Sequence, residues 1–412
     1  MALRHQAQRI IGATFGRGAR GLQKLQARLV PSTGRAFYLV SAAGLPNYGD
    51  EFITRAWLRY LAAEHPDVDV WLDCLEPGRA AFLFADAHPR LRTTNTLWQL
   101  TGLIGDGDPL EVGRTAERLI RELGTPRLDP GLEAIRTMRS VHLLGGGYIN
   151  RLWQNNVGLI HALVAIKRAF GIPIYATGMG LLPQNDDSAE VLRRVLPEFD
   201  LVESRDSAGA QLLGIPLGVD DAFLGITQGD VFDGDASSPE IMILIQGDLI
   251  PDGHVDGLLD AVERFVAGVG GDRGNPIGFV EAIPPDDSRF YELVRGRFPQ
   301  SRFYPFSYLW NIGLPVRPGQ QWLTTRFHIH LLAAAGGAKG AFITGKPGYY
   351  DIKHGSLVEL GTGWSNAGST EAIDESGLHA TGNRRFAAHA IECGEAKLAV
   401  AARLYPVASQ AG

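Results

Sequence analysis

Two short segments of the sequence combine an arginine with residues suited to anion binding or proton transfer. Arg205 follows a short apolar run, and Arg326 stands two residues before His328, just ahead of another apolar run. Residues i and i+2 share one face of an extended chain, so Arg326 and His328 can face the same ligand. Guanidinium groups bind carboxylate or phosphate through paired hydrogen bonds. Imidazole titrates near neutral pH and can donate a proton. The pattern predicts an anion site with an acid beside it.

Glycine-rich turns and polar loops follow other apolar runs. A glycine lets a ligand approach the main chain, and successive backbone N–H groups can hold an anion. A loop with tyrosine and lysine suits sugar-ring and anion contacts. Each segment is also compatible with a purely structural turn. The candidates are Asn47, Gly49 and Asp50; Gly145, Gly146 and Gly147; Gly178; and Tyr350 and Lys353.

These residues lie at the ends of short apolar runs that alternate with amphipathic stretches. The runs predict strands at 37–40, 68–72, 141–144, 172–176, 201–204, 241–245, 277–280 and 340–343. The stretches predict helices at 51–64, 111–124, 130–139, 157–170, 253–268 and 382–403, with a short segment and a helix within 323–335. Such alternation indicates an α/β protein with mostly parallel sheets. We expect two Rossmann-like doubly wound domains facing a cleft, with ligands beyond the carboxyl ends of the strands.

A polar, turn-rich stretch at 226–239 marks the boundary between these domains. We predict a basic N-terminal arm at 1–35, an N-terminal Rossmann-like domain at 36–228, a C-terminal Rossmann-like domain at 238–381, and a C-terminal helix and tail at 382–412. The arm contains no acidic residue and shows helical amphipathicity. It is therefore either a contact for an anionic membrane surface or a solvated or packed extension.

The composition argues against several classes of protein. The formal net charge of −6 disfavours a nucleic-acid binder. No apolar stretch reaches the ~18–20 residues that span a bilayer, and no secretory signal is recognisable. The two cysteines, Cys74 and Cys393, form no metal motif. We expect a cytoplasmic protein with no metal and no cofactor.

The order and spacing of the motifs resemble the polysaccharide pyruvyl transferase family over roughly residues 37–363. The resemblance implies a fold similar to GT-B glycosyltransferases, phosphoenolpyruvate as the donor substrate and a glycan or glycolipid as the acceptor. By position, it implies that the donor contacts are Arg205, Arg326, Phe327 and His328. The matching pieces are residues 47–50, 145–147, 178–180, 204–206, 220–223 and 326–328, and the Tyr350/Lys353 loop.

The sequence departs from the family at two positions. Phe327 stands where many members have leucine. After Trp153, where many members have a histidine, this chain has Asn155 and Asn156, and an amide cannot carry a proton as imidazole does. We expect Asn156 to bind substrate on the acceptor side.

The expected reaction moves the enolpyruvyl group of phosphoenolpyruvate onto a sugar of a cell-envelope polysaccharide or glycolipid, as a ketal, and releases phosphate. His328 is the expected acid, Asp50 or Asp221 the expected base, and Lys353 a third cation. The basic arm would place the enzyme at the inner face of the plasma membrane. Two alternatives stay open: a nucleotide-sugar glycosyltransferase of the same architecture, and a non-catalytic glycan-binding relative.

Overall fold

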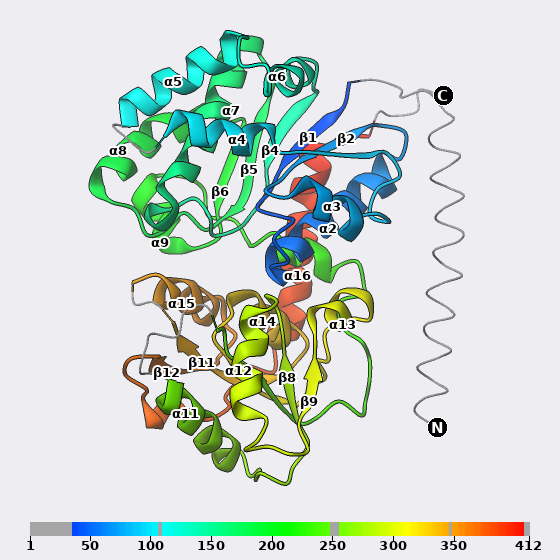
Figure 1. Ribbon diagram of the computed structural model, residues 1–412, viewed down its shortest axis with the longest axis vertical. Coiled ribbons are helices and arrows are strands. Elements are labelled where there is room, and N and C mark those ends of the chain that lie inside the picture. Colours follow the sequence, from blue (N-terminus) through cyan, green and yellow to red (C-terminus); the bar gives the residue numbers. More distant parts are fainter. Residues whose placement is uncertain (1–34, 106–108, 248–254, 346–347, 408–412) are drawn as a thin grey trace.

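The first half of the protein forms a Rossmann-like domain. The computed structural model describes residues 35–105, 109–247, 255–345 and 348–407. Within them, the first domain holds a parallel sheet in the order β3-β2-β1-β4-β5-β6 (Figure 1). Its strands are β1 (Phe37–Val40), β2 (Val70–Asp73), β3 (Leu91–Thr94), β4 (Ser140–Leu143), β5 (Ile174–Met179) and β6 (Leu201–Ser204).

The second domain repeats the same topology. Its parallel sheet has the order β12-β11-β10-β7-β8-β9. Read from β9 to β12, this is the order of the first sheet with the strands renumbered. In each sheet the strand order reverses at one point, between β1 and β4 or between β7 and β10, and such points bind ligands. The strands are β7 (Ile241–Leu244), β8 (Ile277–Val280), β9 (Arg302–Tyr304), β10 (Gln321–Thr324), β11 (Lys339–Thr344) and β12 (Ser365–Ser369).

Helices connect the strands and cover the sheets. The central strands β1, β4 and β7 are buried along their whole length, as expected where helices cover both faces. In the first domain the helices are α2 (Tyr48–Glu64), α3 (Pro77–Leu83), α4 (Thr96–Ile104), α5 (Pro109–Arg121), α6 (Asp129–Ile135), η1 (Arg151–Asn156), α7 (Val157–Phe170), α8 (Asp186–Val195), η2 (Leu196–Glu198), α9 (Ser207–Leu213) and α10 (Ala222–Ile226). The second half has α11 (Val255–Gly268), α12 (Asp286–Val294), α13 (Phe306–Asn311), α14 (Phe327–Ala335), α15 (Tyr350–Leu360), η3 (Glu375–Gly377) and α16 (Phe386–Leu404).

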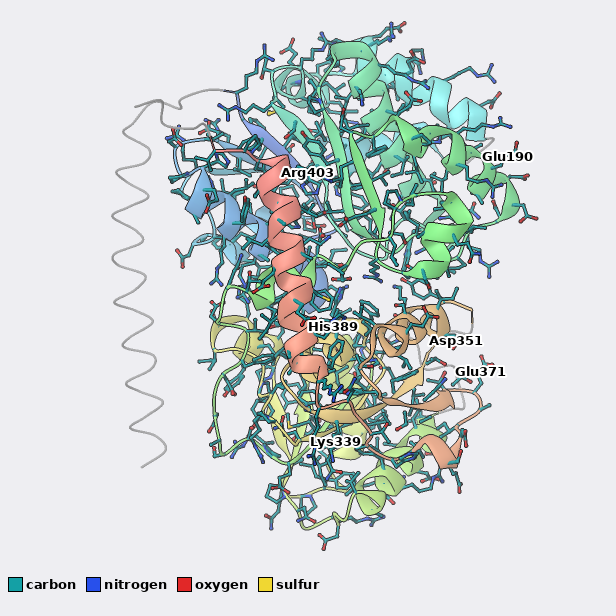
Figure 2. All side chains as sticks on the ribbon, turned by 180° about the vertical axis from the view of Figure 1, so that it is seen from behind. Glu190, Lys339, Asp351, Glu371, His389 and Arg403 are labelled. Atoms are coloured by element: carbon teal, nitrogen blue, oxygen red, sulfur yellow. The ribbon has the colours of Figure 1, made fainter. Side chains whose placement is uncertain are left out.

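The last helix, α16, joins the two domains. Figure 2 shows it running from His389, beside the second domain, to Arg403 on the first. Its buried Lys397 forms ion pairs with Glu203 and Asp221 of the first domain. Just beyond the helix, the Tyr405 hydroxyl lies 2.8 Å from His142 Nδ1 on β4. The helix therefore stabilises the position of one domain relative to the other.

The predicted fold class is confirmed: two doubly wound domains are present. Helix α7 spans the residues predicted for it and ends at Gly171, whose left-handed φ of 65° suits a glycine C-cap. Strands β3, β9 and β12 were not predicted, because they are short and only partly apolar. Strand β10 was not predicted as a strand either, although its end overlaps the short segment expected within 323–335. The helix predicted at 130–139 ends earlier, at Ile135. The N-terminal arm at 1–35 lies, but for Arg35, outside the described residues.

No helix in the described part of the chain has both the length and the hydropathy that crossing a bilayer requires.

Candidate active site

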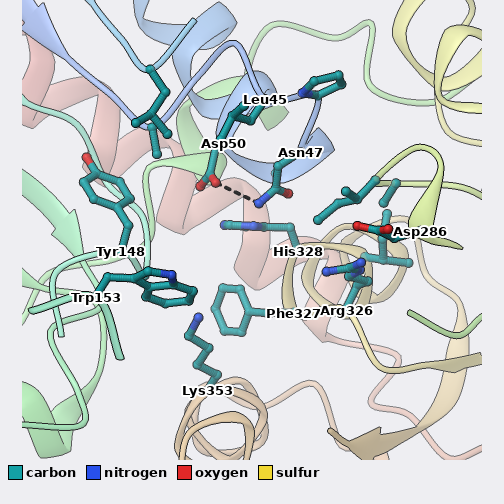
Figure 3. A pocket seen from close by; sticks show the side chains of 18 of the residues that line it. Leu45, Asn47, Asp50, Tyr148, Trp153, Asp286, Arg326, Phe327, His328 and Lys353 are labelled. Carbon is teal, nitrogen blue, oxygen red and sulfur yellow. Dashed lines mark hydrogen bonds between the residues drawn. The ribbon is translucent and has the colours of Figure 1, made fainter. Parts of the chain in front are cut away.

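A cleft of about 580 Å³ lies between the two domains and is lined by loops from both. The lining segments follow β1, β2, β3, β4 and β6 of the first domain and β8, β10 and β11 of the second. All eight therefore come from the carboxyl ends of parallel strands, where open α/β sheets bind ligands. Figure 3 shows the side chains that point into this space.

Arg205 reaches the cleft from the end of β6. Its Nη1 donates a 2.8 Å hydrogen bond to Asp220, and its guanidinium lies 4.1 Å from the centre of the Phe327 ring. Gly180 leaves the room it needs, because a Cβ there would lie 2.8 Å from the guanidinium. The neighbouring Asp206 instead caps α9 by accepting from the Gly209 N–H at 2.6 Å. Arg205 is therefore fixed in direction before any ligand binds.

Arg326 and His328 come from the start of α14 in the second domain. Arg326 Nη2 lies 2.6 Å from Asp287 Oδ1 in a buried ion pair. The His328 ring packs directly on Gly49 of α2, where a Cβ would come within 1.9 Å of His328 Nδ1. Its Nε2 lies 3.6 Å from Asp220 Oδ2, which is too long for a hydrogen bond. Gly49 thus admits an imidazole from the opposite domain.

Asp220 lies between Arg205 of the first domain and His328 of the second. Burial alone would raise the pKa of Asp220, but His328 and Arg205 outweigh it and hold the pKa well below its usual range. The carboxylate therefore stays ionised and orients Arg205 through its hydrogen bond.

Lys353, on α15, completes the cationic part of the cleft. Its ammonium donates a hydrogen bond to the Tyr349 hydroxyl and lies 3.7 Å from the centre of the Tyr349 ring. The Tyr349 hydroxyl in turn donates to the Gly147 carbonyl at 2.9 Å, which links the second domain to the first. Burial, followed by the nearby Arg205, lowers the pKa of Lys353 well below its usual value.

Asp50 is the carboxylate that faces the middle of the cleft (Figure 3). It accepts a 2.8 Å hydrogen bond from Asn47 Nδ2. Burial raises the pKa of Asp50, although His328 and Lys353 act in the opposite direction. A carboxylate with a raised pKa is a better proton acceptor than an exposed one.

Most of the residues singled out from the sequence meet at this cleft. Asn156 lines it as well, and its Nδ2 donates to the Tyr148 carbonyl at 2.9 Å. The predicted residues in the lining are Asn47, Gly49, Asp50, Gly147, Asn156, Arg205, Arg326, Phe327, His328, Tyr350 and Lys353.

Asp221 lies elsewhere, and its prediction as a base facing the substrate is corrected. It is fully buried, and its Oδ2 accepts from Trp57 Nε1, the Gly145 N–H and Thr177 Oγ1 at 2.7–2.9 Å. Its Oδ1 lies 3.0 Å from Lys397 Nζ. Both carboxylate oxygens therefore contact groups of the protein itself, beneath the turn at residues 145–147. Asp221 has a structural role.

The remaining predicted glycines also lie outside the lining, for reasons of packing. Gly145 and Gly178 lie against Asp221, where added Cβ atoms would approach to 3.0 Å and 2.6 Å. Gly146 adopts φ 154° and lies against the Tyr148 ring. These glycines shape the turn, and of the three consecutive glycines Gly147 faces the cleft.

Several residues of the site were not predicted. Asp220 and Asp287 hold the arginines, Tyr349 holds Lys353, and three aromatic residues (Trp98, Tyr148 and Trp153) line one wall. The Asp220–Asp221 pair was a visible signal, but the wrong member was chosen. Among the described residues, no group of three His, Cys, Asp or Glu side chains is arranged to bind a metal ion.

Two solved structures are similar to this chain. The chain resembles UDP-GlcNAc 2-epimerase from Neisseria meningitidis, with 10% identity, a TM-score of 0.52, and coverage of 90% of this chain and 99% of the other. It also resembles a glycosyltransferase from Rickettsia africae ESF-5, with 11% identity, a TM-score of 0.47, and coverage of 90% and 99%. At such identities only the fold is comparable. No curated protein matches the sequence.

The family model described as polysaccharide pyruvyl transferase matches residues 47–346, which include every cleft residue discussed above except Tyr349, Tyr350 and Lys353. The chain belongs to the polysaccharide pyruvyl transferase family.

Proposed function

We propose that this transferase moves the enolpyruvyl group of phosphoenolpyruvate onto two hydroxyls of a sugar, forming a ketal and releasing phosphate. The observation that carries the proposal is the meeting of Arg205, Arg326 and Lys353 with His328 on one cleft between the domains. The acceptor we propose is a glycan or glycolipid of the cell envelope, in keeping with the family.

The charges of the cleft suit a small, highly charged anion. Phosphoenolpyruvate carries about three negative charges, and a guanidinium presents five N–H donors that match carboxylate and phosphate geometry. Asp220 and Asp287 each engage one nitrogen of an arginine and thereby fix its orientation. Such preorganisation lowers the entropic cost of binding and of reaching the transition state.

His328 is the proposed acid. The methylene carbon of phosphoenolpyruvate must take up a proton, which leaves a cationic centre at the neighbouring carbon. The first sugar hydroxyl adds there and loses its proton. The carbon–oxygen bond to phosphate then breaks, phosphate leaves, and the second hydroxyl adds to close the ketal. The two hydroxyls release two protons in all. One replaces the proton taken up by the methylene carbon, and the other is taken up by the departing phosphate.

Asp50 is the proposed base. It lines the cleft near His328, and the raised pKa caused by its burial suits proton uptake from a sugar hydroxyl. Contact of the basic arm with the inner face of the plasma membrane remains a prediction, because the arm lies outside the described residues.

The donor can be tested before the acceptor is known. Calorimetric titration of phosphoenolpyruvate should give saturable binding to the wild-type protein, and Arg205→Ala or Arg326→Ala should weaken it at least tenfold. Arg59→Ala is the matched control, since Arg59 pairs with Asp230 at 2.6 Å and lies outside this cleft. His328→Asn should lower turnover by about 10²–10⁴ in the complete reaction, because it removes the proposed acid.

Parallel incubations with nucleotide sugars distinguish the competing function. Release of phosphate from phosphoenolpyruvate in the presence of envelope glycan supports the proposal. Release of nucleotide from a nucleotide sugar, with no binding of phosphoenolpyruvate, would instead identify a glycosyltransferase.

A further inference from the structure

The two ends of the cleft differ sharply in chemistry. Figure 3 shows Arg326 and Asp286 at one end and Tyr148 and Trp153 at the other, with His328 between them. The second end is lined by three aromatic side chains of the first domain, Trp98, Tyr148 and Trp153, which we call the aromatic wall. An aromatic surface offers no positive charge to a trianionic donor, so the aromatic wall suits a different ligand.

The polar atoms of two members of the aromatic wall are already used within the protein. Trp98 Nε1 donates to the Ser41 carbonyl at 2.8 Å, and the Tyr148 hydroxyl donates to the Leu144 carbonyl at 2.5 Å. The two rings pack together with centroids 5.7 Å apart. Because these polar atoms are hydrogen-bonded within the protein, Trp98 and Tyr148 present the carbon atoms of their rings to the cleft.

Trp153 is the exposed member of the aromatic wall. Its side chain is 46% exposed, whereas Trp98 and Tyr148 are below 10%. Its indole packs edge-on against Tyr349, with ring centroids 5.7 Å apart and an interplanar angle of 71°. Tyr349 also receives the hydrogen bond from Lys353, so Trp153 lies beside the cationic part of the cleft.

The short η1 segment holds the indole in place. Asn150 Nδ2 donates to the Gly147 carbonyl and Asn156 Nδ2 donates to the Tyr148 carbonyl, each at 2.9 Å. Between these two anchors the backbone of Trp153 departs from helical geometry, with φ −127° and ψ 66°. The segment therefore presents a large aromatic face to the cleft in a defined orientation.

A pyranose ring fits such a surface. One face of the ring carries C–H groups with partial positive charge, which are attracted to the negative face of an aromatic ring. Its hydroxyls lie around the edge and need polar partners. Stacking on Trp153 would turn that edge towards Lys353 and Asp50, where the proposed reaction needs two hydroxyls.

We infer that the aromatic wall is the acceptor subsite and that Trp153 is the platform on which a hexopyranose ring of the acceptor stacks. The inference rests on the proposed function in taking the acceptor to be a sugar. It adds the place and the orientation of that sugar, with the ring on the first-domain side and the donor between the sugar and Arg326.

Binding of simple sugars tests the subsite without any turnover. Saturation-transfer NMR with a panel of methyl hexopyranosides should show transfer to the ring protons of at least one glycoside in the wild-type protein. Trp153→Ala should weaken that binding about tenfold, and Trp153→Phe should keep most of it. Phe82→Ala is the matched control, because Phe82 is 87% exposed but does not line this cleft. Circular dichroism melts check that each variant is folded.

The outcomes separate this inference from the proposed function. Absence of binding by every glycoside, or equal binding by wild type and Trp153→Ala, would overturn the acceptor subsite even if phosphate release occurs. Loss of glycoside binding in Trp153→Ala, with an unchanged dissociation constant for phosphoenolpyruvate, supports the subsite. A third outcome is that the protein binds glycosides through Trp153 but does not bind phosphoenolpyruvate. That result would refute the proposed reaction and still support the sugar subsite.

Discussion

The guanidinium of Arg205 lies 4.1 Å from the centre of the Phe327 ring, so a cation of the first domain rests on an aromatic side chain of the second. A cation over an aromatic face gains about 0.5–2 kcal/mol, with the larger values at desolvated sites. Both side chains are largely buried. The contact therefore helps to set the separation of the two arginines that the proposed donor would bridge.

Phe327→Leu should weaken donor binding while preserving an apolar side chain of similar size. We expect the dissociation constant for phosphoenolpyruvate to rise about three- to tenfold, because the cation–π attraction is lost. Calorimetry measures the change. Phe342→Leu is the control, as the Phe342 ring stacks on His354 outside the cleft. Equal donor affinity in both variants would show that the ring acts by packing alone.

Asp220→Asn should impair catalysis more than it impairs folding. The substitution removes the charge that orients Arg205 and faces His328, and hydrogen bonds to charged groups contribute roughly 1.5–3 kcal/mol. We expect kcat/KM to fall about 10- to 100-fold in a phosphate-release assay. Asp230→Asn removes a carboxylate paired with an arginine on the surface and should leave kcat/KM unchanged. Identical values for the two variants would contradict the role of Asp220.

The fold was predictable where the residues decide it locally. Buried parallel strands are nearly continuous apolar runs, and β1, β7 and β8 follow that pattern. Strand β3 reads Leu-Arg-Thr-Thr and is only half-buried, so hydropathy gives no signal for it. It is an edge strand that pairs with β2. That pairing is a tertiary contact, which the residues of β3 alone do not reveal.

The site was predictable to the level of strand ends, because topology places those loops at one cleft. The direction of individual side chains was not. Asp220 and Asp221 are adjacent, yet one faces Arg205 and the other is buried beneath Gly145. Asp287, in the first turn of α12, pairs with Arg326 from 39 residues away. Such contacts have no signature in a single sequence.

Lys397→Met should destabilise the protein strongly. The ammonium of Lys397 is fully buried between Glu203 and Asp221, and removing it leaves two buried carboxylates without their counter-charge. Breaking a buried ion pair in this way costs about 3–5 kcal/mol. We expect a clearly lower urea midpoint. Lys167→Met is the control, because the Lys167–Asp200 pair is about one-third exposed and should contribute at most ~1 kcal/mol. Similar urea midpoints for the two variants would show that the buried Lys397 ion pairs stabilise the fold no more than the Lys167–Asp200 pair does.

Glu51→Gln should stabilise the protein at alkaline pH. Burial raises the pKa of Glu51 from the usual 4.5 to about 8. The folded state therefore binds one more proton than the unfolded state between these values. By linkage, the stabilising contribution of Glu51 is fully present below pH 4.5 and is lost as the pH rises through 8. Glutamine keeps the shape without titrating, so it removes that loss.

The measurement is a pair of melting curves at pH 6 and pH 9. From pH 6 to pH 9 the melting temperature of the wild-type protein should fall by several degrees more than that of Glu51→Gln. The reason is that of these two proteins only the wild type must ionise the buried carboxyl at position 51. Glu64→Gln, at the exposed end of the same helix, controls for the general effect of losing one acidic group. If Glu51→Gln and Glu64→Gln lose the same number of degrees, Glu51 is already ionised in the folded protein at pH 6, and its burial does not govern its charge.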